Sequence, residues 1–180
     1  RELRGSETRK LNKENQYRYA YLHGFGSNAN SYKGTFLRPA FAHAGVHLHL
    51  PDLNYPSFEE LSFDGSLEAI DNLHISTGGD EAGSWRFIGS SMGGYLASRW
   101  AELHPHRVER LVLLCPGFGL TKRWSSLIGH EAFEKWRLLG YHNFVDPQGL
   151  NHRVRWKFIE NARAHPDAPK FAHPARIIHG

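Results

Sequence analysis

The chain has 180 residues, 40% of them hydrophobic and 13% aromatic, and a formal net charge of +4. This is enough apolar material for one domain to bury a core. No run approaches the roughly 18 to 20 apolar residues of a membrane span, and the N-terminus lacks the apolar core of a secretory signal. Basic residues are interspersed with acidic ones, so the charge does not indicate a nucleic-acid partner. We therefore expect a soluble, cytoplasmic, single-domain protein.

The first half of the chain alternates strands and helices. Residues 1–16 are polar, with an excess of basic side chains, and are interpreted as a tail ahead of the domain. The elements expected after it are strand Tyr17–Leu22, helix Ser31–His43 interrupted or kinked at Pro39, strand Val46–Leu50, helix Leu67–Ile75, strand Trp85–Ile88, a helix to about Leu103 and strand Arg110–Cys115. This order predicts an α/β fold with a mostly parallel sheet covered by helices on both faces.

Residues 118–170 break this alternation. They contain amphipathic helical stretches at Phe133–Leu139 and Arg153–Ala164, before Ala175–Ile178 restores a strand. We interpret the segment as a helical, cap-like insertion over one edge of the sheet. Its aromatic residues either line an acyl pocket or pack the helices onto the sheet, and we expect a mixture; they are Trp124, Phe133, Trp136, Phe144, Trp156 and Phe158.

One short motif carries a specific chemistry. The residues Gly89-Ser90-Ser91-Met92-Gly93 match G-x-S-x-G, between a predicted buried strand and a predicted helix. A serine hydroxyl is a poor nucleophile until the backbone exposes it to a base and aims amide groups at the developing oxyanion. The sharp strand-to-helix turn does both, and the glycines leave room for it. We therefore predict that Ser91 is a nucleophile. The alternative is a plain glycine-rich turn.

A second glycine-rich turn agrees with this prediction. The residues His23-Gly24-Phe25-Gly26-Ser27 also follow a predicted strand and precede a helix. The carboxyl ends of parallel strands share one edge of a sheet, so the backbone N–H of Phe25 can point to the same crevice as that of Met92. The two amides would form an oxyanion hole. His23 is expected to stabilise this loop and not to abstract a proton.

Four segments together resemble the α/β-hydrolase superfamily, in particular its small single-domain serine esterases of the bacterial YqiA type. They are YLHGFGS, LPDLNYPSF, FIGSSMGGYLASRWAELHPHRVERLVLLCPGFG and PARIIHG, and the similarity covers about residues 17–180. The resemblance implies that Ser91 attacks an ester or thioester carbonyl and that the amides of Phe25 and Met92 hold the oxyanion. It also implies that the catalytic Asp and His follow Ser91, in that order.

The acid and the base of this family have no matching residues in the chain. In the family the acid lies a few residues beyond a segment that PARIIHG resembles, and the histidine follows one further strand. Asp146 and Asp167 both fall in the insertion, and the position of His179 precedes that of the acid. We therefore expect that the catalytic Asp and His lie beyond Gly180, that the last strand and helix of the domain are missing, and that this 180-residue piece alone is nearly inactive.

Other reactive side chains are expected to be structural. No Cys partner, HExxH pair or carboxylate cluster accompanies the histidines, among them His47 and His49, so no metal site is predicted. Cys115 ends an apolar run and is expected to be a buried thiol.

The leading hypothesis is thus a serine hydrolase of a small carboxylic ester or thioester that needs no cofactor. The alternatives are an acyltransferase using the same serine and a non-catalytic ligand-binding protein of the same fold. The oligomeric state is left open.

Overall fold

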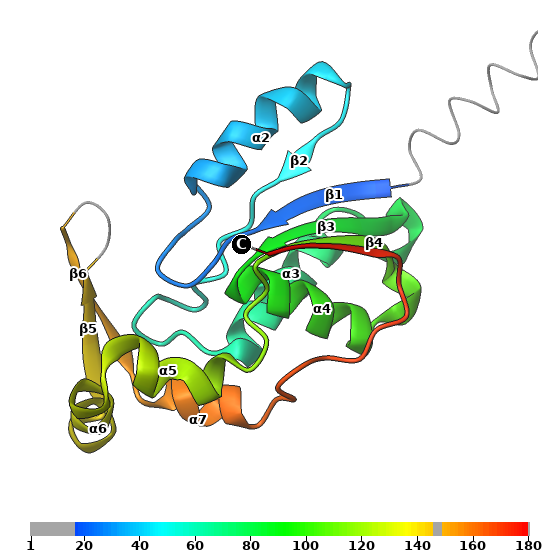
Figure 1. Ribbon diagram of the computed structural model, residues 1–180. Coiled ribbons are helices and arrows are strands. Elements are labelled where there is room, and N and C mark those ends of the chain that lie inside the picture. Colours follow the sequence, from blue (N-terminus) through cyan, green and yellow to red (C-terminus); the bar gives the residue numbers. More distant parts are fainter. Residues whose placement is uncertain (1–16, 146–148, 180) are drawn as a thin grey trace, which may run out of the picture.

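The computed structural model describes residues 17–145 and 149–179, which form an α/β architecture (Figure 1). The expected tail and Asp146 lie outside the described residues. The strands are β1 (Tyr17–Leu22), β2 (Leu48–His49), β3 (Ser84–Ser90), β4 (Val108–Leu114), β5 (Tyr141–Val145), β6 (Asn151–Arg155) and β7 (Ala175–Ile178). The α-helices are α2 (Tyr32–His43), α3 (Phe63–Ser76), α4 (Met92–Leu103), α5 (Leu120–Ile128), α6 (His130–Leu139) and α7 (Lys157–Arg163), with short 3-10 helices at Gly79–Ala82 and Pro105–Arg107.

The main sheet is parallel, in the order β2-β1-β3-β4-β7. From β1 the chain first moves outward to β2, and it then returns to β3 and continues on the other side to β4 and β7. The strand order therefore reverses between β1 and β3. At such a switch point the loops after two neighbouring strands diverge, and they leave a crevice at the carboxyl edge where α/β proteins bind ligands.

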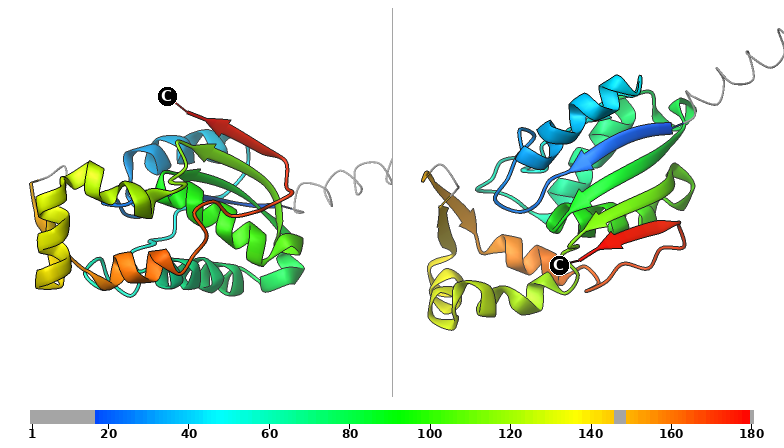
Figure 2. Two further views of the ribbon diagram at one scale, coloured as in Figure 1. Left: turned by 60° about the horizontal axis from the view of Figure 1, so that its bottom comes forward. Right: turned by 45° about the horizontal axis from the view of Figure 1, so that its top comes forward.

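Helices cover both faces of this sheet, as predicted. In Figure 2, α2 lies on one face near β1 and β2, whereas α3 and α4 lie on the other. The α4 side holds the core: Phe87 of β3 packs edge-on against Trp100 of α4, with ring centroids 5.5 Å apart, and both side chains are buried. On the opposite face Phe41 of α2 contacts Tyr19 of β1 at 5.6 Å. The helix α2 continues through Pro39 to His43.

The insertion differs from its prediction because it contains strands as well as helices. After α5 and α6, strands β5 and β6 pair in an antiparallel hairpin, and α7 begins only at Lys157. Residues Arg153–Arg155, predicted as the start of a helix, are the end of β6. Val154 explains the error, because one buried side chain in a polar stretch fits a helix face as well as a strand.

The expectation of a buried thiol is wrong. Cys115 is exposed, because β4 ends at Leu114 and the next residue turns away with a φ of 45°. Its backbone N–H donates to the carbonyl of Ile178 at 2.7 Å and so extends the pairing of β4 with β7.

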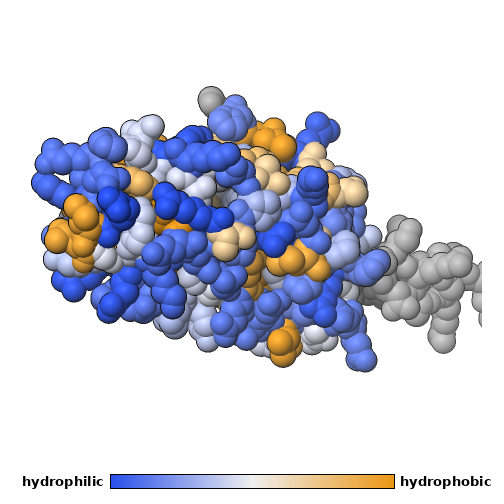
Figure 3. Space-filling model, turned by 90° about the horizontal axis from the view of Figure 1, so that it is seen from below, coloured by the Kyte–Doolittle hydropathy of each residue, from blue (hydrophilic) through white to orange (hydrophobic). Residues whose placement is uncertain are grey.

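The outer surface of the helical layer is polar. Figure 3 shows the underside of the molecule as largely hydrophilic, with hydrophobic residues scattered over it and not gathered in one patch. Within the part of the chain that the structure describes, no helix has the length and apolar character that crossing a membrane requires.

Candidate active site

Ser91 occupies the turn between the central strand β3 and helix α4. Its φ of 52° is one of two positive values among the described non-glycine residues. A side chain with a Cβ rarely adopts such a backbone, and in native proteins this strain gathers at functional sites. Ser91 is partly buried, whereas the next residue, Met92, is fully buried. The turn thus presents the serine hydroxyl at the carboxyl edge of the sheet, beside the switch point.

Glycines make this turn possible by letting backbones touch. A Cβ on Gly89 would lie 2.4 Å from the carbonyl oxygen of Gly93, and one on Gly93 would lie 2.1 Å from that of Leu22. Both distances are impossible for a real side chain. Glycine is therefore required at both positions where the motif has it, and Gly93 brings the start of α4 against the end of β1.

Backbone hydrogen bonds fix the serine in place. Its N–H donates to Leu114 at the end of β4, at 2.9 Å, and its carbonyl accepts from Gly117 at 2.8 Å. The same carbonyl also accepts from Gly94 and Tyr95, which begins the hydrogen bonding of α4. Ser91 is thereby tied to the end of β4 and to the loop that follows it, as well as to its own helix.

The loop after β1 lies against the serine. A Cβ on Gly24 would be 3.3 Å from the Cβ of Ser91 and 3.9 Å from its Oγ. Phe25, whose amide was predicted to hold an oxyanion, follows Gly24 directly. The predicted site residues from His23 to Gly26 and from Gly89 to Gly93 are therefore brought together at one sheet edge.

His23 is a buried structural residue, with 1% of its surface exposed. Its Nδ1–H donates to the carbonyl of Gly24 at 2.9 Å, and its Nε2 accepts from the N–H of Leu53 at 2.9 Å. Both ring nitrogens are thus engaged by the backbone, and His23 cannot also serve Ser91. The Oδ1 of Asp52 lies beside this contact, 3.2 Å from Nε2.

The segment Asp52 to Asn54 is a part of the site that sequence analysis did not assign. Asp52 accepts from the N–H of Asn54 at 3.0 Å, and the Asn54 side-chain N–H donates to the carbonyl of Ser27 at 2.8 Å. Together with the bond from Leu53 to His23, these contacts clamp both ends of the loop that carries Phe25. The motif LPDLNYPSF was the available signal, but nothing in it indicates which loop it would contact.

The insertion packs on the same loop through aromatic rings. The ring of Phe25 lies 4.9 Å from those of Trp124 and Phe144 and 5.4 Å from that of Phe158. Most of the insertion's aromatic residues are buried in this cluster, among them Trp136 at 0% exposure. Phe144 also lines a cavity, and whether that cavity takes an acyl group stays a prediction.

The histidines and aspartates after Ser91 do not complete a triad among the described residues. No hydrogen bond between described residues joins a histidine to Ser91. His173 lies beyond reach, since its Nε2 bonds to the carbonyl of Pro105 near the amino end of β4. His179 follows β7 at the carboxyl edge and is exposed. Asp167 pairs with Lys122.

No group of three or more His, Cys, Asp or Glu side chains within the described ranges is arranged to hold a metal ion. The rings of His47 and His49 contact each other with centroids 4.4 Å apart, at the sheet edge formed by β2.

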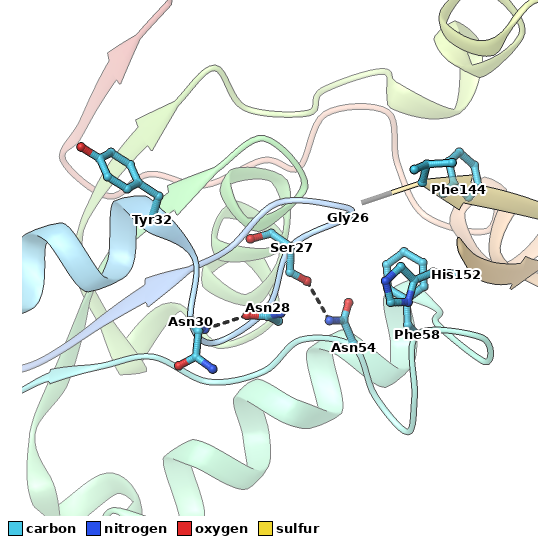
Figure 4. Close-up of a pocket in the computed structure, with 10 residues that line it drawn as sticks. Gly26, Ser27, Asn28, Asn30, Tyr32, Asn54, Phe58, Phe144 and His152 are labelled. Atoms are coloured by element: carbon cyan, nitrogen blue, oxygen red, sulfur yellow. Dashed lines mark hydrogen bonds between the residues drawn. The ribbon is translucent and has the colours of Figure 1, made fainter. Parts of the chain in front are cut away.

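A cavity of about 300 Å³ opens beside the loop after β1 (Figure 4). Gly26 and Ser27 form one side of it, Asn54 lies below them, and Phe144 and His152 of the hairpin face them. The residues that line this cavity therefore come from the sheet edge and from the insertion, an arrangement typical of a substrate pocket under a cap.

Comparison with known proteins agrees with this architecture. The model of the uncharacterised protein family UPF0227 matches residues 18–150, nearly three quarters of the chain. The chain belongs to the UPF0227 family. No curated protein sequence matches it.

Solved structures similar to this UPF0227 chain share its fold. A putative hydrolase from Agrobacterium vitis has a TM-score of 0.71 and 20% identity, over 90% of this chain and 67% of that protein. Est1E from Butyrivibrio proteoclasticus has a TM-score of 0.67 and 17% identity, over 95% of this chain and 69% of that protein. Alpha/beta hydrolase domain-containing protein 10 from mouse has a TM-score of 0.64 and 20% identity, over 90% of this chain and 68% of that protein. These matches confirm the α/β-hydrolase fold.

Proposed function

We propose that the protein is a serine hydrolase that cleaves a carboxylic ester or thioester through an acyl-enzyme on Ser91. The observation that carries the proposal is the backbone of Ser91, with its φ of 52° at the end of β3 and Gly24 packed against it. Strain of this kind presents a hydroxyl and surrounds it with backbone N–H groups. The fold shared with Est1E, a structure of which holds ferulic acid, and with lipolytic enzymes named LipS and LipT adds support.

The proposed reaction has two halves. The Ser91 Oγ attacks the carbonyl carbon while a base takes its proton, and the backbone N–H groups of Phe25 and Met92 donate to the oxyanion. The alcohol or thiol then leaves with a proton, and the acyl group stays on Ser91. Water attacks this acyl-enzyme in the same manner and releases the acid. We place the base and its carboxylate partner outside the described residues, because His23 is fully engaged and His173 is remote.

The first test is covalent labelling. A fluorophosphonate probe should label the protein expressed from its whole reading frame, and Ser91→Ala should abolish the labelling. The same variant should reduce p-nitrophenyl butyrate hydrolysis by about 1000-fold or more, the usual effect of removing a triad serine. Ser90→Ala is the matched control, since Ser90 is also partly buried but ends β3, and it should label normally. Absence of labelling together with Ser91-independent hydrolysis would contradict the proposal, and absence of both labelling and hydrolysis would favour a ligand-binding protein.

The second test locates the base. Residues 1–180 alone and the product of the whole reading frame are compared for p-nitrophenyl acetate and butyrate hydrolysis, each with and without Ser91→Ala. Activity restricted to the longer product would support the expectation that the acid and base follow Gly180. Ser91-dependent activity in residues 1–180 would instead assign the base to a histidine in that range, His179 first. Release of the acyl group to an added acceptor in preference to water would favour an acyltransferase.

A further inference from the structure

The cavity beside the loop after β1 has a specific chemical character. Three of the residues that line it are asparagines, Asn28, Asn30 and Asn54, and none of its described lining residues is Asp, Glu, Lys or Arg. Apart from the imidazole of His152, the described lining has no side chain that could offer an opposite charge to a buried charged ligand group, which makes the burial of such a group unfavourable. Side-chain amides, in contrast, offer both donors and acceptors to neutral groups. The lining therefore suits a polar but uncharged group.

One acceptor in this lining has no partner. The Oδ1 atom of Asn54 is buried and makes no hydrogen bond in the structure. Its orientation is fixed, because the Nδ2 of the same amide donates to the carbonyl of Ser27 at 2.8 Å. Figure 4 shows this oxygen turned away from Ser27, on the side where Phe58 and His152 lie. A buried unpaired acceptor is costly, so the site favours any group that brings it a donor.

The opposite wall is aromatic and rests on the oxyanion loop. Phe58 contacts the ring of His152 at 5.3 Å and that of Phe25 at 5.5 Å, and Phe144 contacts Phe25 at 4.9 Å. These rings offer a carbon chain an apolar surface across from the asparagines. Since Gly24 touches Ser91 and Gly26 lines the cavity, one short loop connects the two.

We propose that this cavity binds an uncharged group of the substrate that bears a hydrogen-bond donor, a hydroxyl or an amide N–H on a short carbon chain, with the Oδ1 of Asn54 as its acceptor. The inference rests on the proposed function, because it assigns the cavity to an ester that reacts at Ser91. It makes Asn54 a specificity-determining residue. A purely alkyl chain would leave the acceptor unpaired, and a carboxylate would be repelled by the partial negative charge of the Asn54 Oδ1.

The test compares esters that differ at one terminal group. On the acyl side these are p-nitrophenyl hexanoate, its ω-hydroxy derivative and p-nitrophenyl monoadipate, which ends in a carboxylate. On the alcohol side they are hexyl acetate and ω-hydroxyhexyl acetate, followed by titration of the released acid. In one of these series kcat/KM should be higher for the hydroxyl ester than for the alkyl ester by about threefold to tenfold, the value of one net hydrogen bond. The carboxylate ester should be the poorest acyl substrate.

Variants of Asn54 test the assignment of the acceptor. Asn54→Leu should remove the preference for the hydroxyl ester. Asn54→Asp keeps an acceptor oxygen but loses the N–H that donates to Ser27, so it should lower the rates with all the esters and that with monoadipate most. Asn143→Leu is the matched control, because Asn143 is exposed on β5 next to Phe144 but does not line the cavity, and it should behave as the wild type.

Equal kcat/KM for alkyl and hydroxyl esters in both series, with hydrolysis still dependent on Ser91, would overturn the inference but not the proposed function. The same holds if Asn54→Leu keeps the preference. A binding measurement decides the matter if no ester is hydrolysed. In isotope-labelled Ser91→Ala protein, methyl ω-hydroxyhexanoate should shift the NMR signal of the Asn54 side-chain amide, and methyl hexanoate should not. Identical spectra with both esters would refute the inference.

Discussion

At the scale of single residues, Gly93 joins the turn at Ser91 to the loop after β1. An alanine Cβ there would lie 2.1 Å from the carbonyl oxygen of Leu22 and 2.5 Å from that of His23. Because both obstacles are backbone atoms, Gly93→Ala must displace the end of β1. We expect it to lower the free energy of unfolding by about 1 to 3 kcal/mol, the usual range for overpacking, and to reduce ester hydrolysis. Urea unfolding and initial rates measure the two effects.

Gly94→Ala is the control for that substitution. The two glycines are adjacent in α4, so alanine brings each a similar gain in helix propensity, about 1 kcal/mol. At Gly94 the nearest atom to the new Cβ is the carbonyl oxygen of Gly89, at 3.0 Å. We therefore expect a clearly smaller loss of stability. Equal losses for the two variants would show that the approach of α4 to β1 is not what requires glycine.

At the scale of elements, Trp136 holds the insertion together. It is fully buried in α6, and its indole N–H donates to the carbonyl of Val154 in β6 at 3.0 Å. Trp136→Ala should lower the free energy of unfolding by about 3 to 5 kcal/mol, because it leaves a large void and an unpaired carbonyl. Hydrogen exchange should show the loss of protection in α5 to α7 first, with β1 and β3 still protected.

Leu138→Ala provides the comparison on the same helix. Leu138 is 74% exposed, so its removal should change stability by no more than about 0.5 kcal/mol. Uniform loss of protection across the sheet and the insertion in Trp136→Ala would contradict the expectation that α5 to α7 lose protection first.

The elements that sequence alone predicts are those with a strong local pattern. The strand β3, the turn at Ser91 and helix α4 are encoded within one stretch, where an apolar run, a glycine motif and a helical period follow each other. The hairpin of β5 and β6 was missed because both strands are short and β6 has a single apolar residue, Val154. The clamp of Asn54 on Ser27 joins residues 27 positions apart, and no local pattern can indicate such a pairing. The predicted roles of Ser91, Phe25 and Met92 remain predictions.

At the scale of the whole molecule, a buried charge network ties the sheet to α3. Arg18 of β1 donates to the Nδ1 of His74 at 3.0 Å and lies over the ring of Trp85 at 4.4 Å. The indole of Trp85 also donates to this Nδ1, at 3.1 Å, while the Nε2 of His74 faces Asp80. His74 is thus held in its neutral form. Burial, with the charges of Arg18 and Arg107, lowers its pKa below the ordinary 6.5.

This network makes stability depend on pH in a definite direction. Below about pH 6.5 the unfolded chain binds a proton at His74 that the folded protein resists. The free energy of unfolding should therefore decrease as the pH falls through this value and should level off above it. His49, His104 and His142, whose pKa values are also lowered mainly by burial, add to the same slope.

Urea unfolding at several pH values between about 7.5 and 5.5, the range that spans the ordinary histidine pKa, measures the slope. His74→Gln should make it shallower, whereas His43→Gln, at an exposed position that ends α2, should leave it as in the wild type. A slope unaffected by His74→Gln would refute the role of the network.

The backbone of Ser91 also has an evolutionary consequence. A residue with a Cβ pays about 1 to 3 kcal/mol for a φ such as its 52°, and glycine does not. Selection for stability alone would therefore favour a drift from serine to glycine at position 91, through a single change that removes the hydroxyl. A lineage that retains serine there retains it against this gradient, and the proposed role of Ser91 as the nucleophile supplies the opposing selection.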